Sequence, residues 1–138
     1  MKTDYSIKAI TIAAINRAIM NPEDWLFSVV CLNNDDKDFL LEENELPIFK
    51  IVSSEAKTLI TTRRILEKSQ DSLHSILFEE VNEVIWGNFK MDINKPELSK
   101  FTVVDMYENT FYYQMETGKA SVGLIKAVIM IRKLRASN

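Results

Sequence analysis

The middle of the chain, residues 47–116, consists of short β-branched and aromatic segments separated by polar turns, and this pattern constrains the fold most. Ile48–Val52 is the first strand segment. Thr58–Glu67 follows as a second, with Leu59 and Ile65 on one face and Leu66 on the other. Because the connections are too short for crossover helices, consecutive strands are expected to pair antiparallel.

The rest of this region continues the pattern. Lys68–Ser72 is polar enough for a hairpin loop, and Asp92–Lys100 is predicted to be a turn-rich loop. The remaining strands are predicted at Ser75–Phe78, Val84–Phe89, Phe101–Met106 and Thr110–Glu116, the last two as a hairpin. Upstream, Trp25–Leu32 is predicted to be a strand or a buried helical turn.

A helix is predicted on each side of the strand region. The first runs from Asp4 to Met20 and stops before Pro22, because proline disfavours a helical residue before it. Its apolar face is wide and has to be covered by the body of the domain or by a second subunit. The second helix runs from Ser121 to Leu134, after a break at Gly118.

Length and composition indicate one globular domain over residues 1–138. The chain is 46% hydrophobic and 27% charged, far from a disordered composition. A net charge of −3 argues against a nucleic-acid partner. The charge is uneven, since residues 23–45 hold eight acids and one lysine, whereas residues 119–135 hold five basic residues and no acid. Such polarity is compatible with self-association or a charged partner, whereas a solvated mixed surface is the commoner explanation.

The predicted fold class is α+β, mainly β: a strongly bent antiparallel sheet or partly open barrel, capped by the C-terminal helix. Two segments, Thr58–Lys68 (TLITTRRILEK) and Ser75–Trp86 (SILFEEVNEVIW), resemble strands of the bacterial pleckstrin-homology-like domains. The ending, a strand at Phe111–Glu116 and then an amphipathic helix, is also similar. The resemblance covers residues 45–134 and leaves residues 1–22 as an N-terminal helical extension.

The resemblance implies a non-enzymatic binding module, because domains of that family serve as scaffolds for lipid head groups, peptides or other proteins. A protein segment or a second copy, held as a homodimer through the N-terminal helix, is the first expectation for the partner. The alternatives are recognition of an anionic membrane surface, and a small-ligand-binding or enzymatic α+β domain with an apolar pocket.

The candidate contacts for an anionic lipid are Lys57, Arg63 and Arg64, which the resemblance places near the basic residues of phosphoinositide-binding relatives. Neighbouring residues on a strand point to opposite faces, so both arginines cannot hold one ligand. The competing interpretation is that one arginine pairs with Glu80 or Glu83.

Trp86 and Tyr112 are the candidate anchors for a protein partner if they are exposed, and core residues otherwise. Alternation along the last strand places Phe111 and Tyr113 on one face and Tyr112 on the other.

No catalytic, cofactor-binding or metal-binding residues are predicted. His74 is the single histidine and is expected on the surface of a hairpin loop, where it has no second ligand for zinc. Cys31 is the single cysteine, within an apolar run that predicts a buried, inert thiol. No signal peptide is expected, because charged residues interrupt the first apolar stretch, so the predicted location is cytoplasmic.

Overall fold

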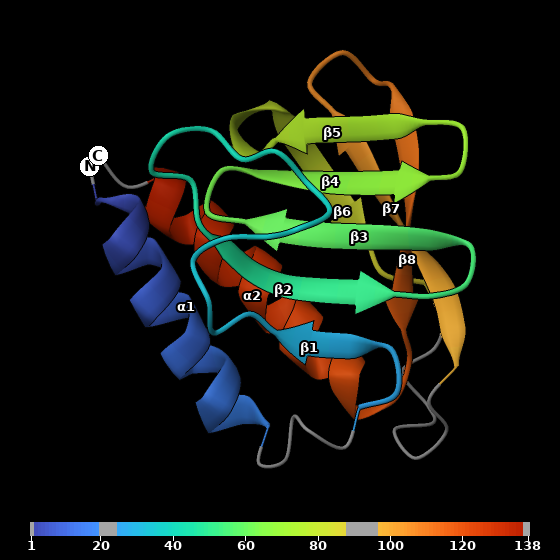
Figure 1. The fold of residues 1–138 in the computed structure, drawn as a ribbon. Coiled ribbons are helices and arrows are strands. Elements are labelled where there is room, and N and C mark those ends of the chain that lie inside the picture. Colours follow the sequence, from blue (N-terminus) through green and yellow to red (C-terminus); the bar gives the residue numbers. More distant parts are fainter. Residues whose placement is uncertain (1, 20–24, 88–96, 137–138) are drawn as a thin grey trace.

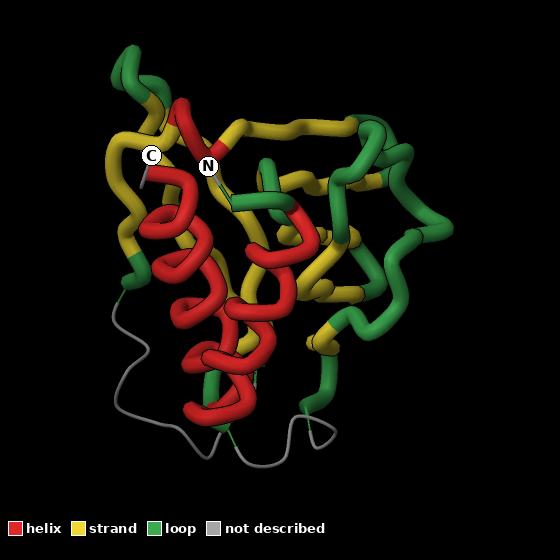
Figure 2. Tube along the Cα trace, turned by 90° about the vertical axis from the view of Figure 1, so that its left-hand side faces the viewer, coloured by secondary structure: helices red, strands yellow, loops and turns green. Residues whose placement is uncertain are grey.

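The computed structural model describes residues 2–19, 25–87 and 97–136. Two helices lie side by side against two antiparallel sheets (Figures 1 and 2). In chain order the elements are α1 (Asp4–Ala18), β1 (Ser28–Val30), β2 (Pro47–Val52), β3 (Ala56–Thr61), β4 (Arg64–Ser69), β5 (Leu73–Leu77), the short 3-10 helix η2 (Phe78–Glu80), β6 (Val81–Ile85), β7 (Leu98–Asp105), β8 (Thr110–Glu116) and α2 (Lys119–Ala136).

The strands form two separate sheets. The first has the order β1-β2-β3-β4-β5 and the second the order β6-β7-β8, and every neighbouring pair is antiparallel. The predicted α+β class and antiparallel pairing are therefore confirmed. The expected single bent sheet or barrel is not what forms, because the two sheets are distinct and do not close.

The predicted strand Thr58–Glu67 is wrong, since it is a hairpin of β3 and β4 with its turn at Thr62 and Arg63. The side chain of Thr61 makes this turn, because its Oγ1 accepts the N–H groups of Arg63 and Arg64 at 3.1 and 3.0 Å. A threonine hydroxyl can replace the glycine or asparagine of a typical turn in this way.

The last hairpin forms at the predicted place. β7 and β8 pair from Leu98 opposite Glu116 to Val104 opposite Thr110. The Asp105 carboxylate accepts the N–H groups of Tyr107 and Asn109, both at 2.8 Å, and so holds the turn. β7 also starts earlier than predicted, which places residues 98–100 in a strand and not in the loop; residues 92–96 of that loop lie outside the described residues.

The upstream and middle segments differ from prediction mainly at their ends. Only Ser28–Val30 of the predicted segment Trp25–Leu32 pairs as a strand. β5 starts at Leu73, and Phe78 belongs to η2. β6 starts at Val81, and residues 88 and 89 of the strand predicted at 84–89 lie outside the described residues.

The two helices cover the core from one side. α1 is capped by Thr3, whose Oγ1 accepts the N–H of Ser6 at 3.1 Å, and ends at Ala18; Met20 is outside the described residues. Its buried side chains Ile7 and Ile15 belong to the same core as α2 and β2, so the apolar face is covered within the chain. α2 begins at Lys119, two residues before the predicted start.

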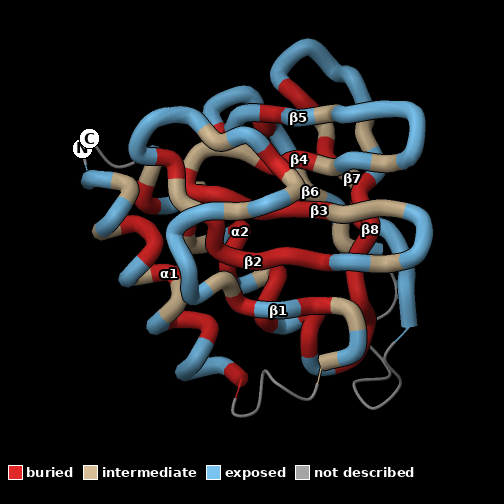
Figure 3. The backbone as a smooth tube through the Cα atoms, in the orientation of Figure 1, coloured by how far each residue is buried: buried red, intermediate tan, exposed pale blue. Residues whose placement is uncertain are grey.

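The core lies between the helices and the inner faces of both sheets (Figure 3). Phe49, Phe101, Tyr113 and Met115 are its large fully buried side chains besides the aliphatic ones. A second, smaller core on the outer face of the five-stranded sheet joins Phe39 to Leu59 and Leu66. The segment 33–46 therefore lies over that outer face and covers it.

Among the described residues, the hydrogen bonds that join β8 to β1–β5 and the segment before β1 all involve a side chain. The N–H of Gln114 donates to the Glu67 carboxylate at 2.8 Å, and its own side-chain amide donates to the Ile51 carbonyl at 3.0 Å. The buried Glu116 carboxylate accepts the N–H groups of Leu26 and Phe27 at 2.9 and 2.8 Å. We call this boundary the seam.

Candidate functional site

Each of the cations predicted to hold a lipid is in an ion pair within the chain. Lys57 contacts the Asp38 carboxylate at 2.8 Å, and Lys50 contacts the other oxygen of Asp38 at 2.6 Å and Asp36 at 2.8 Å. The hydrogen bonds from Lys50 and Lys57 lower the pKa of Asp38 to about 2. These pairs hold the segment 33–46 against the sheet.

The two adjacent arginines are also paired, each with a different acid from the one predicted. Arg63 lies in the β3–β4 turn and contacts Asp4 of α1 at 3.0 Å. Arg64 contacts Glu45 at 2.9 Å, and the Glu45 side chain is fully buried. Burial alone would raise the pKa of Glu45, but hydrogen bonds from Arg64 and from Thr61 outweigh burial and lower it. The predicted pairing of one arginine with Glu80 or Glu83 is wrong, and the two arginines instead connect the β3–β4 hairpin to α1 and to the segment before β2.

The two aromatic residues predicted as partner anchors, Trp86 and Tyr112, differ in their exposure. Trp86 is half-buried and packs on Phe101, with ring centroids 4.9 Å apart. Tyr112 is 62% exposed. It shares a cross-strand row with Thr102 and Ile85, and Ile85 is 46% exposed. The predicted division of the last strand is confirmed, because Tyr113 is buried and Phe111 is half-buried on the opposite face.

His74 is half-buried in β5, and the prediction that it lies on a loop surface is wrong. Its Nδ1 lies 2.7 Å from the hydroxyl of Tyr113, and its ring packs on Phe111 with centroids 4.3 Å apart. Burial raises the pKa of Tyr113 above its ordinary range, so its hydroxyl stays protonated. His74 and Tyr113 thus connect the two sheets.

A Cys–His catalytic pair does not form. Cys31 follows β1 and His74 lies in β5, so they are at opposite edges of the five-stranded sheet. Burial raises the pKa of the Cys31 thiol to about 12, and a protonated thiol is a poor nucleophile. No group of three or more His, Cys, Asp or Glu side chains in the described part of the chain is placed to hold a metal ion.

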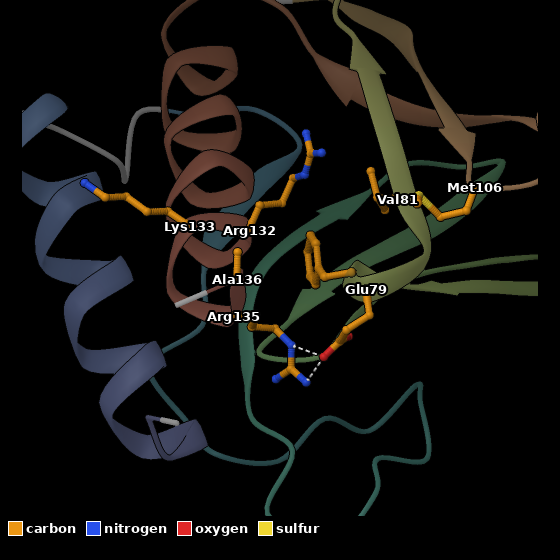
Figure 4. Close-up of a pocket in the computed structure, with 8 residues that line it drawn as sticks. Glu79, Val81, Met106, Arg132, Lys133, Arg135 and Ala136 are labelled. Atoms are coloured by element: carbon orange, nitrogen blue, oxygen red, sulfur yellow. Dashed lines mark hydrogen bonds and ion pairs between the residues drawn. The ribbon is translucent and has the colours of Figure 1, made fainter. Parts of the chain in front are cut away.

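A groove of about 500 Å³ lies beside the C-terminal end of α2 (Figure 4). Its other walls are η2, the start of β6 and the residue that follows β7. The lining residues are Phe78, Glu79, Val81, Met106, Arg132, Lys133, Arg135 and Ala136. The volume falls within the range of ligand sites, about 300–1,000 Å³.

The groove has an apolar floor and a cationic rim. Phe78 and Val81 are buried beneath it, and Met106 is 60% exposed. Arg135 donates to the Glu79 carboxylate through two nitrogens and to the carbonyl of Thr62 at 3.0 Å, so its charge is neutralised in place. In Figure 4 the Lys133 side chain points away from the other lining residues.

Arg132 differs from Arg135. Its guanidinium donates to the Asn82 carbonyl at 3.3 Å and makes no ion pair with any carboxylate of the described residues. In Figure 4 it extends from α2 toward the β6 side of the groove. An arginine in this state keeps its planar donor set available for a carboxylate.

Sequence reasoning did not identify this groove, because its walls come from three segments that are distant in the chain. The one signal present in the sequence was the run of five basic residues without an acid at residues 119–135.

Comparison of the chain with models of protein families, with curated proteins and with solved structures finds no match. Among the described residues, no helix combines the length and the apolar character needed to cross a bilayer.

Proposed function

We propose that this protein is a non-enzymatic interaction module on a pleckstrin-homology-like scaffold, which binds a segment of another protein in the groove beside α2. The order of elements supports the scaffold: the strands from β2 to β8 form two antiparallel sheets and are followed by one amphipathic helix. Fold alone does not define a function, so the proposal depends on the groove.

The observation that carries the proposal is the Arg132 guanidinium, which has no carboxylate partner among the described residues, above an apolar floor of Phe78 and Val81. Arginine binds carboxylates bidentately, and a buried apolar floor takes up a neighbouring side chain of the same ligand. The expected ligand is therefore a short peptide segment in which an acidic residue lies beside a large apolar one.

A polyanionic lipid head group fits this groove less well. Glu79 lies on the rim and neutralises Arg135, so one guanidinium and not a cluster faces the ligand. The cations first predicted for a lipid, Lys57, Arg63 and Arg64, are held by Asp38, Asp4 and Glu45. Binding of an anionic membrane is accordingly the alternative, and the vesicle experiment of the next section tests it.

The proposal is tested by selecting displayed random peptides on the wild-type protein and measuring the affinity of the selected peptides by fluorescence anisotropy. We expect the selected peptides to pair an acid with a large apolar residue. Arg132→Glu should weaken their binding about tenfold or more, as expected when one partner of a close charge pair is reversed. The matched control is Arg17→Glu, which alters an exposed arginine of α1 and should change affinity less than about twofold.

Selected peptides that bind wild type and Arg132→Glu equally well would disprove the groove as the binding site. A selection that yields no peptide above an unrelated control protein would contradict the interaction function itself.

A further inference from the structure

The solvent-facing side of α2 carries a regular stripe. Lys119, Val122, Lys126 and Ile129 are exposed and follow one another at spacings of three, four and three residues. This is the spacing of the a and d positions of a coiled coil, which places side chains in a single row along a helix. Val122 is 39% exposed and Ile129 is 54% exposed, so aliphatic groups alternate with lysines on the surface. We call these four residues the α2 stripe.

Charge is divided between the helices and the rest of the chain. Together, α1 and α2 contain seven of the 17 basic residues but one of the 20 acidic residues. The rest of the chain therefore contains ten basic and nineteen acidic residues. The single acid of the helices, Asp4, is bound by Arg63. The two helices lie side by side in one layer (Figure 2), so this layer is positive on a molecule that is negative overall.

We propose that the α2 stripe is a docking face for an acidic amphipathic helix of a different protein. The inference takes from the proposed function only that the protein is an interaction module, since the stripe does not line the groove. The 3-4-3 spacing matches the row of a and d residues on a second helix. The lysines of the stripe attract glutamates that flank those apolar positions. The stripe spans about 15 Å of helix from Lys119 to Ile129.

A second copy of this chain is a poorer occupant. Its helices hold one acid between them, and pairing α2 with α2 would bring lysines together. A membrane surface is also a poorer fit, since interfacial helices usually present a broad apolar face with aromatic residues. α2 contains no Trp, Tyr or Phe, and its exposed large apolar side chains are Val122 and Ile129.

The test uses the full chain and two synthetic peptides. The first is a helix of about three heptads with leucine at a and d and glutamate at e and g, and the second is a scrambled peptide of the same composition. Affinity is measured by isothermal titration calorimetry at about 0.15 M salt, with peptide dilution heats subtracted. The substitutions are at exposed positions, and urea unfolding of each variant verifies that it is folded.

We expect wild type to bind the helical peptide and not the scrambled one. Lys126→Glu should weaken binding about tenfold and Ile129→Ser about fivefold. The matched control is Lys100→Glu, which makes the same charge change at an exposed lysine of β7 and should alter affinity less than about twofold. Equal binding of the helical peptide by wild type and Lys126→Glu would overturn the proposal.

Two further arms separate the competing occupants. In the first arm, the protein is sedimented with vesicles of phosphatidylserine and phosphatidylcholine. If wild type binds these vesicles, Lys126→Glu does not, and the helical peptide does not bind, the stripe is a membrane-binding surface. A concentration-dependent dimer in light scattering that Ile129→Ser dissolves would assign it to a second copy. Either result overturns the partner-helix proposal. If groove-selected peptides bind and the helical peptide does not, the stripe proposal fails while the proposed function stands.

Discussion

The basic residues of the five-stranded sheet and two lysines of α2, Lys119 and Lys126, have opposite surroundings. On the outer face of the sheet, Lys50 and Lys57 share Asp38, and Arg64 is bound by the buried Glu45. On α2, Lys119 and Lys126 are exposed, and the helix contains no acid. A cation is therefore a candidate ligand contact only after its internal partners are assigned, since pairs that hold a segment in place are unavailable to a ligand.

The largest effect is expected when Glu45, the buried acid that pairs with Arg64 of β4, is removed. Glu45→Ala leaves the Arg64 guanidinium without its carboxylate and should destabilise the protein by about 3 kcal/mol. Urea unfolding followed by tryptophan fluorescence measures the loss. The matched control is Glu43→Ala, an exposed neighbour, which should change stability by less than about 0.5 kcal/mol. Equal effects of the two variants would show that the ion pair does not stabilise the fold.

Acid should loosen the sheet side through the same pairs. The pKa of Asp38 is lowered from 3.8 to about 2 by hydrogen bonds from Lys50 and Lys57. Because the folded-state pKa lies below the unfolded one, ionised Asp38 contributes stability above about pH 4 that is lost as the pH falls toward 2. The pKa values of Asp4 and Glu45 are also lowered, so their contributions decline as the solution is acidified.

The measurement is the midpoint of urea unfolding at about pH 5 and at about pH 2.5. Most of the Asp38 contribution to stability is lost between these two pH values. Asp38→Asn should lower the midpoint at the higher pH and reduce the difference between the two. An unchanged difference would mean that Asp38 does not titrate in this window.

A smaller loss of stability is expected when Lys57, the more exposed of the two lysines paired with Asp38, is removed. Lys57 is 40% exposed and shares Asp38 with Lys50, so Lys57→Ala should cost about 0.5 kcal/mol. High salt should reduce the difference between this variant and wild type, because salt screens exposed charges. Thermal unfolding at low and high salt measures both effects, and a salt-independent difference would point to lost side-chain packing instead.

The smallest effect is expected on α2. Lys126→Ala should change stability by less than about 0.3 kcal/mol, because Lys126 is exposed and makes no ion pair within the described residues. Comparison with Lys57→Ala under the same conditions sharpens the contrast between the two sides. A cost as large as that of Lys57→Ala would mean that Lys126 has a structural partner.

Local patterns in the sequence predicted the helices and the last hairpin, because helix caps, glycine breaks and alternation act over a few residues. The β3–β4 turn escaped prediction, since Thr61 makes it within a segment that alternates like a strand and has no glycine, proline or asparagine. Pairings such as Asp4 with Arg63 depend on how distant segments meet, and no local pattern encodes that.

The same limit applies to the candidate sites. The basic run at residues 119–135 was visible in the sequence, but the groove needs Phe78, Val81 and Met106 from other segments. The α2 stripe is different, because its spacing lies within one helix. Identifying it required knowing which face of α2 packs on α1, and the structure supplied that.

The seam has a consequence for how this architecture can vary. A continuous barrel fixes the angle between its two halves through its strand pairing, whereas here Gln114, Glu67 and Glu116 connect β8 to the five-stranded sheet and to the segment before β1 through side chains. Shorter or longer side chains at these positions would tilt one half against the other without unpairing a strand. None of the residues that line the groove belongs to β1–β5, so such a tilt would reposition the five-stranded sheet without rebuilding the walls of the groove.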